Sequence, residues 1–269
     1  MIDAGLLTCV GIGFAIGIAM GLTGAGGGIL AVPALVASMG WSMQQAAPVS
    51  LVAVACAASA GAAHGMRHDL VRYRAAFLMA AVSLPFSLLG VVLAHRLSQP
   101  VLFVLFAVVV ILTAIRLLRI RPDDLATPGS AADRTINPHT GRFSWTWPTA
   151  LRLAAMGAAA GTISGLLGVS GGFLVVPLLR SFTALSMQAI VATSLFVTAL
   201  ISVGSVCNAF AHGAQIPLAF TSLFAVATVT GMLLARRLGR NLPHAHVQRG
   251  FAILFIFMAL ILAAQAFAV

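Results

Sequence analysis

The sequence predicts an all-α polytopic membrane protein built from two homologous halves. Hydrophobic residues make up 61% of its 269 positions and charged residues only 7%, which is far below the charge content of soluble domains. Residues 4–66 contain no Asp, Glu, Lys or Arg, and as a helix this run is roughly 95 Å long, about three crossings of a bilayer core. The period-two alternation of membrane β-strands is absent, so the spans are expected to be helices.

A glycine-rich motif that occurs twice indicates the duplication. Gly13–Leu35 reads GFAIGIAMGLTGAGGGILAVPAL, and Gly157–Leu179, at positions higher by 144, reads GAAAGTISGLLGVSGGFLVVPLL. Ser42-Met43-Gln44 recurs as Ser186-Met187-Gln188 at the same offset, so the repeat extends beyond the glycines. A chain that interrupts hydrophobic helices with glycines at matching places in two halves is typical of secondary transporters.

Each half is expected to hold five apolar elements. They cover about 4–22, 27–39, 44–66, 75–95 and 100–118, and then 152–167, 171–183, 188–211, 215–235 and 250–268. The predicted domains are a first transmembrane repeat at 1–118, a polar cytoplasmic linker at 119–148 and a second transmembrane repeat at 149–269. Trp145 and Trp147 are expected to mark the membrane interface where the next helix begins.

Arginine placement favours an inverted 5+5 arrangement. The net charge of +10 comes from 15 Lys and Arg against 5 acidic residues. We interpret these basic residues as signals that orient the protein in the membrane rather than as a surface that binds nucleic acid. If all five elements of each half cross, 14 of the 15 Arg lie on one side and only Arg96 lies opposite. Four crossings per half would split them nine against six, so the positive-inside rule prefers inversion, with both termini outside.

The helix that follows each glycine run is predicted to be short and to begin inside the membrane. Residues 27–39 span roughly 20 Å as a helix, less than the bilayer core. The first N–H groups of such a helix must line a cavity enclosed by protein, where they suit an anion. The candidate residues at the two breaks are Thr23, Gly24, Gly26, Gly27, Gly28, Gly168, Ser170, Gly171 and Gly172. The regular G-x-x-x-G steps upstream are expected to be helix contacts instead.

These motifs resemble the TauE/SafE sulfite exporter family, also called the 4-toluene sulfonate uptake permease family. The resemblance rests on G-x-x-x-G-x-x-G-x-G-G-G-x-L-x-V-P-x-L, its second copy and the A-x-x-S-L segment that follows. It covers nearly the whole chain apart from the linker, and it implies a bacterial inner-membrane carrier of small sulfur-containing anions. One departure is that Thr193-Ser194-Leu195 has Val49-Ser50-Leu51 as its first-half partner, so any site there is asymmetric.

Other polar residues inside apolar elements are further candidates. Ser50, Thr193 and Ser194 are able to donate to a sulfonyl oxygen, although a helical hydroxyl more commonly bonds its own i−4 carbonyl. Gln44 and Gln188 stand at equivalent helix starts, where they either cap the helix or line the cavity. Asn208 is an amide in a membrane helix and is expected to face protein rather than lipid.

Histidines and prolines supply the remaining hypotheses. His64 and His212 are candidates for carrying a coupled proton, with an interfacial location as the simpler alternative. Pro33 and Pro177 are expected either to kink the short helices or to end their first turns, and to act as hinges. No spacing of the three Cys or of His244 and His246 suits a metal, so neither a metal nor a cofactor is expected.

The sequence therefore predicts a secondary transporter that exports sulfite or organosulfonates by alternating access in the bacterial inner membrane. Its expected partners are the small sulfur-containing anion and membrane lipid, without nucleic acid, and its oligomeric state stays open. The alternatives are an uptake carrier for sulfonates or other organic anions, and an anion channel. A membrane enzyme is disfavoured because no acid–base or metal set is present, and no ATP-binding G-x-x-x-x-G-K-[S/T] motif occurs.

Overall fold

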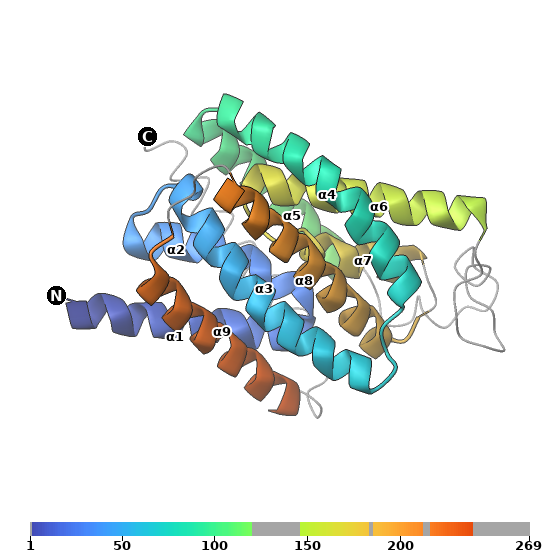
Figure 1. The fold of residues 1–269 in the computed structure, drawn as a ribbon, viewed down its shortest axis with the longest axis horizontal. Helices are drawn as coiled ribbons and strands as arrows, with labels where there is room; N and C mark the ends of the chain where they lie inside the picture. The colour runs from blue at the N-terminus through green and yellow to red at the C-terminus, as the bar shows by residue number, and fades with distance from the viewer. Residues whose placement is uncertain (1, 120–145, 183–184, 212–215, 239–269) are drawn as a thin grey trace.

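The computed structural model describes residues 2–119, 146–182, 185–211 and 216–238, and within these ranges it contains helices and no strand (Figure 1). The elements are α1 (Ile2–Thr23), the 3₁₀ helix η1 (Ala25–Leu30), α2 (Ala31–Met39), α3 (Met43–Arg67), α4 (Tyr73–Arg96), α5 (Gln99–Arg119), α6 (Trp147–Leu167), α7 (Gly172–Phe182), α8 (Met187–Ala211) and α9 (Leu218–Leu238). The helices α3, α4, α6, α8 and α9 are long and apolar enough to span a membrane. The all-helical membrane fold is confirmed, while the expected element 250–268 and most of the linker lie outside the described residues.

The start of α3 shows which glutamine caps a helix. The hydroxyl of Ser42 accepts from the backbone N–H of Gln45, and the Gln45 side chain accepts from the Ser42 N–H, each at 3.3 Å. This reciprocal pair satisfies two of the amide donors that a helix start leaves open. Of the two roles expected for Gln44, the cap belongs to its neighbour, and Gln44 lines a cavity instead.

The two glycine breaks differ from each other. In the first half the expected short apolar helix at 27–39 is present, but the glycine run forms its first part as the 3₁₀ helix η1, and the α-helix α2 begins at Ala31. Consecutive glycines have little preference for the α-helical backbone and accept the tighter 3₁₀ turn. In the second half Gly168 ends α6 with φ 64°, and α7 starts directly at Gly172. Pro33 is the third residue of α2, where a missing N–H is tolerated, and the helix continues to Met39.

Two parallel helix pairs use the G-x-x-x-G steps as contact faces. Along α1, Gly13, Gly17 and Gly21 meet α9 at Phe224, Thr228 and Met232 in that order. Along α6, Gly157, Gly161 and Gly165 meet α4 at Met79, Ser83 and Ser87 in that order. A Cβ at Gly17 or Gly161 would overlap the carbonyl oxygen of the facing helix. The expectation that these glycines serve packing is therefore confirmed, and the first helix of each half packs on the fourth helix of the other.

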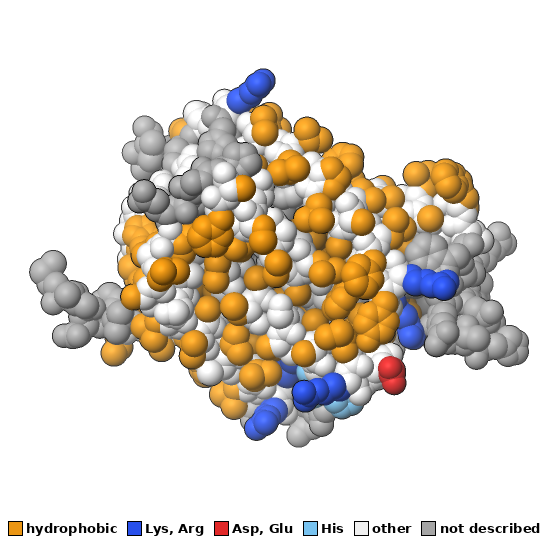
Figure 2. Space-filling view, viewed as in Figure 1, with side chains coloured by type: hydrophobic (Ala, Val, Ile, Leu, Met, Phe, Trp, Pro, Cys, Tyr) orange, Lys and Arg blue, Asp and Glu red, His pale blue; other side chains and the backbone are white. Residues whose placement is uncertain are grey.

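The bundle has one end that is rich in arginine. The guanidinium of Arg236, near the end of α9, donates to the carbonyl of Gly61 in the last two turns of α3, at 2.6 Å. At the same end, Arg72 precedes α4 and its N–H donates to the hydroxyl of Thr193 near the start of α8, at 3.1 Å. We call this the arginine end; Arg96, at the end of α4, lies at the opposite end. Figure 2 shows hydrophobic side chains across the face between them, with Arg at its margins.

Candidate functional site

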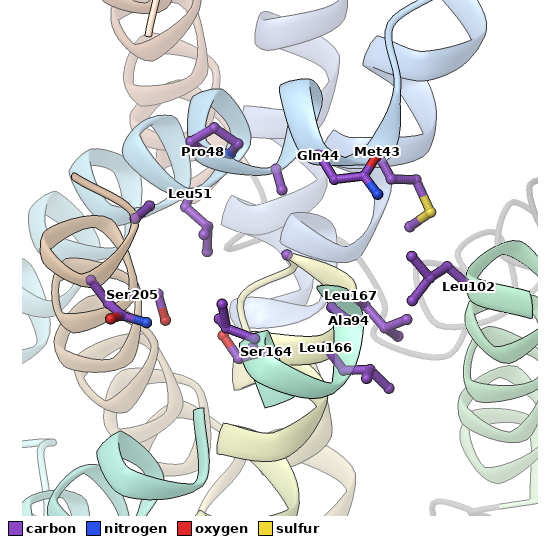
Figure 3. A pocket seen from close by; sticks show the side chains of 16 residues that line it. Met43, Gln44, Pro48, Leu51, Ala94, Leu102, Ser164, Leu166, Leu167 and Ser205 are labelled. Carbon is purple, nitrogen blue, oxygen red and sulfur yellow. The ribbon is translucent and has the colours of Figure 1, made fainter. Parts of the chain in front are cut away.

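A cavity of about 290 Å³ opens between helices at the end opposite the arginine end (Figure 3). Its walls come from the start of α3 and α5, the end of α4 and α6, and the last two turns of α8. Most of the lining is apolar, and the polar groups are contributed by Gln44, Ser164, Ser205 and Asn208 together with the backbone of Gly168. A mostly apolar hollow with a few converging polar groups is the usual form of a small-ligand site.

The two glycine breaks converge beside the inner end of this cavity. A Cβ built on Gly28, in η1, would lie 3.8 Å from the Cβ of Ser170, which immediately precedes Gly171 and α7. The convergence that the sequence predicts is thus present in the backbone. Gly24, with φ 83°, lies against Ser194 of α8, whose hydroxyl is 3.4 Å from the Cβ position. The hydroxyl of Ser50 in α3 lies 3.4 Å from the carbonyl oxygen of Gly168.

Several buried hydroxyls on helices of the cavity and at the second break have no hydrogen-bond partner in the described structure. In the described part of the chain they belong to Ser83 of α4, Ser164 of α6, Ser170 at the second break, and Thr198 and Ser202 of α8. All five residues are at most 1% exposed. A buried hydroxyl that makes no hydrogen bond costs about 1–3 kcal/mol, so five of them in one bundle call for an explanation, and a bound polar species is one.

These hydroxyls extend the polar lining of the cavity inward. Thr198, Ser202 and Ser205 follow helical spacing and therefore share one face of α8. Ser205 reaches the cavity and lies 3.3 Å from the hydroxyl of Ser87 on α4. The row thus continues from the cavity along α8 towards the arginine end.

The hydroxyl candidates named from sequence mostly bond to their own helix. Thr23 donates to Ala19 O at 2.7 Å, Ser50 to Ala47 O at 2.8 Å and Ser194 to Val191 O at 2.9 Å. Thr193 accepts the N–H of Arg72 and thereby fixes the turn before α4. These hydroxyls keep acceptor capacity for neighbours, but the protons of Thr23, Ser50 and Ser194 are already engaged.

The glycines at the two helix breaks also allow close packing against neighbouring helices. A Cβ on Gly27 would overlap the backbone of Ala19 and Met20 in α1, and one on Gly171 would overlap Ala160 in α6. Each break therefore folds back against the first helix of its own half. Gly26 lies within η1 and Gly172 is the first residue of α7. The assignment of the break glycines to ligand binding stays a prediction.

The remaining candidates lie apart from the cavity. Gln188 is exposed in the first turn of α8. His64, exposed near the end of α3, borders a hollow of about 500 Å³ at the arginine end together with Leu233, Arg236 and Arg237. Pro177 lies in the middle of α7, and His212 falls outside the described residues.

Sequence reasoning missed two serines of the cavity wall and three buried hydroxyls on the same helices. They are Ser83, Ser164, Thr198, Ser202 and Ser205, and isolated hydroxyls of this kind are common in membrane helices. The signal available was the 198–202–205 spacing, which places three hydroxyls on one face of an otherwise apolar helix. Which neighbouring helices they face was not readable from that spacing.

The site carries no acidic side chain in the part of the chain that the structure describes. The acidic residues in the described part of the chain are Asp3, near the start of α1, and Asp69, in the turn between α3 and α4. Neither lines the cavity. Among the described residues, no three His, Cys, Asp or Glu lie together so that they could hold a metal ion. What the site offers is neutral donors, namely hydroxyls, amides and backbone N–H groups.

Comparison with known proteins places the chain in a family. The sequence model of the family described as Sulfite exporter TauE/SafE matches residues 9–262, nearly the whole chain. The chain belongs to the TauE/SafE sulfite exporter family. The doubled motif predicted this membership, and the five long apolar helices of the described residues agree with a multi-pass membrane protein of that family.

Curated relatives of this TauE/SafE protein carry general names. A "Probable membrane transporter protein" of Xylella fastidiosa strain 9a5c is 29% identical over 177 residues, covering 65% of this chain and 62% of the relative. The "Probable membrane transporter protein MamO" of Magnetospirillum gryphiswaldense is 26% identical over 260 residues, covering 85% of this chain and 40% of the relative. The chain thus spans less than two thirds of each of these relatives. No solved structure matches it.

Proposed function

We propose that this protein is a secondary transporter that exports a small sulfur-containing anion, sulfite or an organosulfonate, across the bacterial inner membrane by alternating access. One observation carries the proposal. A cavity of about 290 Å³ leads to converging glycine breaks and to buried hydroxyls that have no hydrogen-bond partner. A small tetrahedral or pyramidal anion fits a volume at the lower limit of ligand sites.

The chemistry of the lining favours an anion. The hydroxyl of Ser164 at the cavity wall has a proton to donate, as has that of Ser202 further along α8, and the amide side chains of Gln44 and Asn208 form part of the wall. The start of α7 contributes the positive end of a helix dipole next to Ser170. Neutral donors suit a substrate that must leave again, since a buried arginine or lysine would hold an anion too tightly in a low dielectric. A cation would find no carboxylate along the walls that the structure describes.

Helix directions support an inverted repeat. α1 runs parallel to α9, which ends at the arginine end, whereas α6 runs parallel to α4, which begins there. The first helices of the two halves therefore run in opposite directions. The same holds for α3 and α8, because Gly61 lies against Leu195 and Gly65 against Ala192. With the arginine end in the cytoplasm, as the positive-inside rule favours, the cavity opens to the periplasm.

Transport in the outward direction rests on the family's description as sulfite exporters. An export carrier must release substrate into the periplasm from a state like this one, with its cavity on that side. The closed packing at the arginine end favours a carrier over an open anion channel, because a channel needs a continuous path. Uptake by the same structure is the alternative in which the cycle runs in reverse.

Ligand-induced stabilisation of the purified full-length protein tests the substrate class. We expect sulfite, or a short sulfonate such as sulfoacetate, to raise the melting temperature, because a ligand that binds the folded state stabilises it by mass action. Sulfate, phosphate, acetate and taurine complete the panel. Flux into proteoliposomes then checks whether the stabilising anion is moved and whether its rate saturates.

A matched pair of variants links that stabilisation to the site. Ser164→Ala removes a hydroxyl at the cavity wall, whereas Ser222→Ala removes an exposed hydroxyl that bonds its own helix. The shift should shrink in the first variant and persist in the second. A shift that is unchanged in Ser164→Ala, or a panel in which no sulfur anion binds folded protein, contradicts the proposal, and flux without saturation would indicate a channel.

A further inference from the structure

The repeat relates the helices of the open cavity to helices at the arginine end. α3 and α8 both have 25 residues and are related by adding 144, as Ser50-Leu51 and Ser194-Leu195 show. Gly90–Leu97, at the end of α4, and Gly231–Leu238 of α9 are related by adding 141. Every cavity position on these helices therefore has a defined counterpart in the other half.

By the repeat, residues that line the cavity correspond to residues of the other half that lie close together. Leu51 corresponds to Leu195, Val91 to Met232 and Ser205 to Gly61. Pro48 corresponds to Ala192, and Ala209 to Gly65. Asn208, the amide at the cavity wall, corresponds to His64.

The counterpart residues at the arginine end contact one another, whereas the residues that line the open cavity are separated by it. A Cβ on Gly61 would lie 2.9 Å from Leu195 Cδ1 and 3.1 Å from Met232 Cε, so both side chains close on Gly61. A Cβ on Gly65 would lie 2.7 Å from the Cβ of Ala192. The equivalent residues in the first set, Ser205 with Leu51 and Val91, face each other across the cavity. The same set of positions is thus open at one end and packed shut at the other.

A latch holds the packed end together. Arg236 Nη1 donates to the carbonyl oxygen of Gly61 at 2.6 Å, which ties α9 to α3 across the closed group. The position that corresponds to Arg236 in the first half is His95. Outside the latch, His64 and Arg237 border the hollow of about 500 Å³ that leads towards the closed group. A basic mouth of this kind attracts anions from the solvent.

The two helix pairs differ in register by one helical turn. Gly17 of α1 faces Thr228 of α9, whereas its counterpart Gly161 of α6 faces Ser83 of α4. By the repeat, Ser83 corresponds to Phe224, which stands four residues before Thr228. A one-turn slide of about 5.4 Å in each pair would exchange the two registers, and such steps are a known form of conformational switching.

We propose that the chain contains a second anion cavity, closed in this structure, at the arginine end. It is lined by Gly61, His64, Gly65, Ala192, Leu195 and Met232, and the hydrogen bond from Arg236 to Gly61 is the latch that keeps it shut. Opening it while the first cavity closes admits the anion from the basic mouth. This inference rests on the proposed alternating-access transport and names its second site and its gate.

Cysteine accessibility tests the exchange. In full-length protein with Cys9, Cys56 and Cys207 replaced by Ala, we would compare Ser205→Cys with its counterpart Gly61→Cys, using a membrane-impermeant maleimide on vesicles of each orientation. Leu51→Cys and Leu195→Cys form a second pair that only shortens side chains, in case Gly61→Cys fails to fold. The thiols introduced at positions 205 and 51 should react from the side of the open cavity, while those at positions 61 and 195 should be protected.

Breaking the latch should reverse the pattern. Arg236→Ala removes the hydrogen bond to Gly61, and Arg237→Ala is the matched control at the same mouth. We expect Arg236→Ala to raise modification at position 61 or 195 from the arginine side by about tenfold and to lower that at position 205 or 51, because a charge-assisted hydrogen bond biases a two-state equilibrium by at least that factor. Arg237→Ala should leave both unchanged.

The outcomes separate this inference from the proposed function. If the protein transports sulfite but the thiols at positions 61 and 195 stay unmodified with and without the latch, the second cavity is wrong and the transport function stands. The same conclusion follows if Arg237→Ala acts as strongly as Arg236→Ala. If accessibility exchanges as described but no anion of the panel is moved, the substrate assignment is wrong and the second cavity stands.

Discussion

The hydroxyl of Ser50 lies 3.4 Å from the carbonyl oxygen of Gly168, although the two residues are 118 positions apart. The repeat-related pair repeats this relationship, since Ser194 Oγ lies 3.4 Å from the Cβ position of Gly24. Each helix break is thus held against the Ser-Leu segment of the opposite half. A movement of one half relative to the other must therefore pass through both breaks, which are also the places where substrate is expected to bind.

The left-handed glycine at the second break should resist substitution. Gly168 has φ 64°, and a Cβ there would also overlap the Cβ of Ala47. Gly40, at the end of α2, has a similar φ of 65° but open space around it. We expect Gly40→Ala to lower the free energy of unfolding by about 1 kcal/mol through backbone strain alone, and Gly168→Ala to lower it by more. Equal losses in thermal or denaturant unfolding would show that the Ala47 contact is unimportant.

Helix packing at the G-x-x-x-G steps sets a second expectation. Gly17→Ala should lower the unfolding free energy by about 1–3 kcal/mol, because its Cβ would overlap the Thr228 carbonyl and force α1 away from α9. Gly11→Ala, on the same helix with nothing within 4 Å, is the control. It should be neutral or stabilising by up to about 1 kcal/mol from helix propensity. Indistinguishable melting temperatures for the two variants would refute the close approach of α1 and α9.

Removing a buried hydroxyl of α8 should lower the affinity for the anion without lowering the stability of the fold. Ser202→Ala removes a hydroxyl that is 0% exposed and has no hydrogen-bond partner, so we expect unchanged or higher stability without ligand. Affinity for the transported anion should fall about tenfold, because a hydrogen bond to a charged group is worth about 1.5–3 kcal/mol.

Thr228→Val on α9 is the control for that experiment. Its hydroxyl already donates to Phe224 O at 2.7 Å within the helix, so no anion-binding proton is lost. Titration of each variant with sulfite gives the affinities, and melting temperatures without ligand give the stabilities. Lower stability of Ser202→Ala together with unchanged affinity would assign Ser202 to packing.

The hydroxyl of Thr193 is expected to stabilise the fold rather than to bind the anion. It accepts the backbone N–H of Arg72 at 3.1 Å and anchors the turn that joins α3 to α4. Thr193→Val should lower the unfolding free energy by about 1 kcal/mol and increase proteolysis within residues 68–72. Thr193→Ser, which keeps the hydroxyl, should restore both. An anion-affinity loss in Thr193→Val at unchanged stability would instead support the binding role suggested by the sequence.

Several features followed from the sequence because they depend on local physics. Long apolar segments without charge have to be membrane helices, since backbone polar groups in lipid must bond within the segment. The doubled motif located both helix breaks, and the regular glycine steps predicted close helix contacts, which the packing of Gly17 and Gly161 confirms. The family also followed, because the doubled motif is specific.

Other features depended on which helices meet, and this only the tertiary structure decided. The segment 25–30, which contains the glycine run, was free to form either an α-helix or a 3₁₀ turn, and the packing of Gly27 on Ala19 and Met20 accompanies the tighter choice. The hydroxyls of Ser83, Ser164 and Ser202 look ordinary on their own helices. They form a candidate site only because α4, α6 and α8 bury them together without partners. The sequence by itself determined the elements and their breaks, since hydrophobicity and backbone freedom are local, whereas the cavity and its polar lining arise from contacts between distant residues.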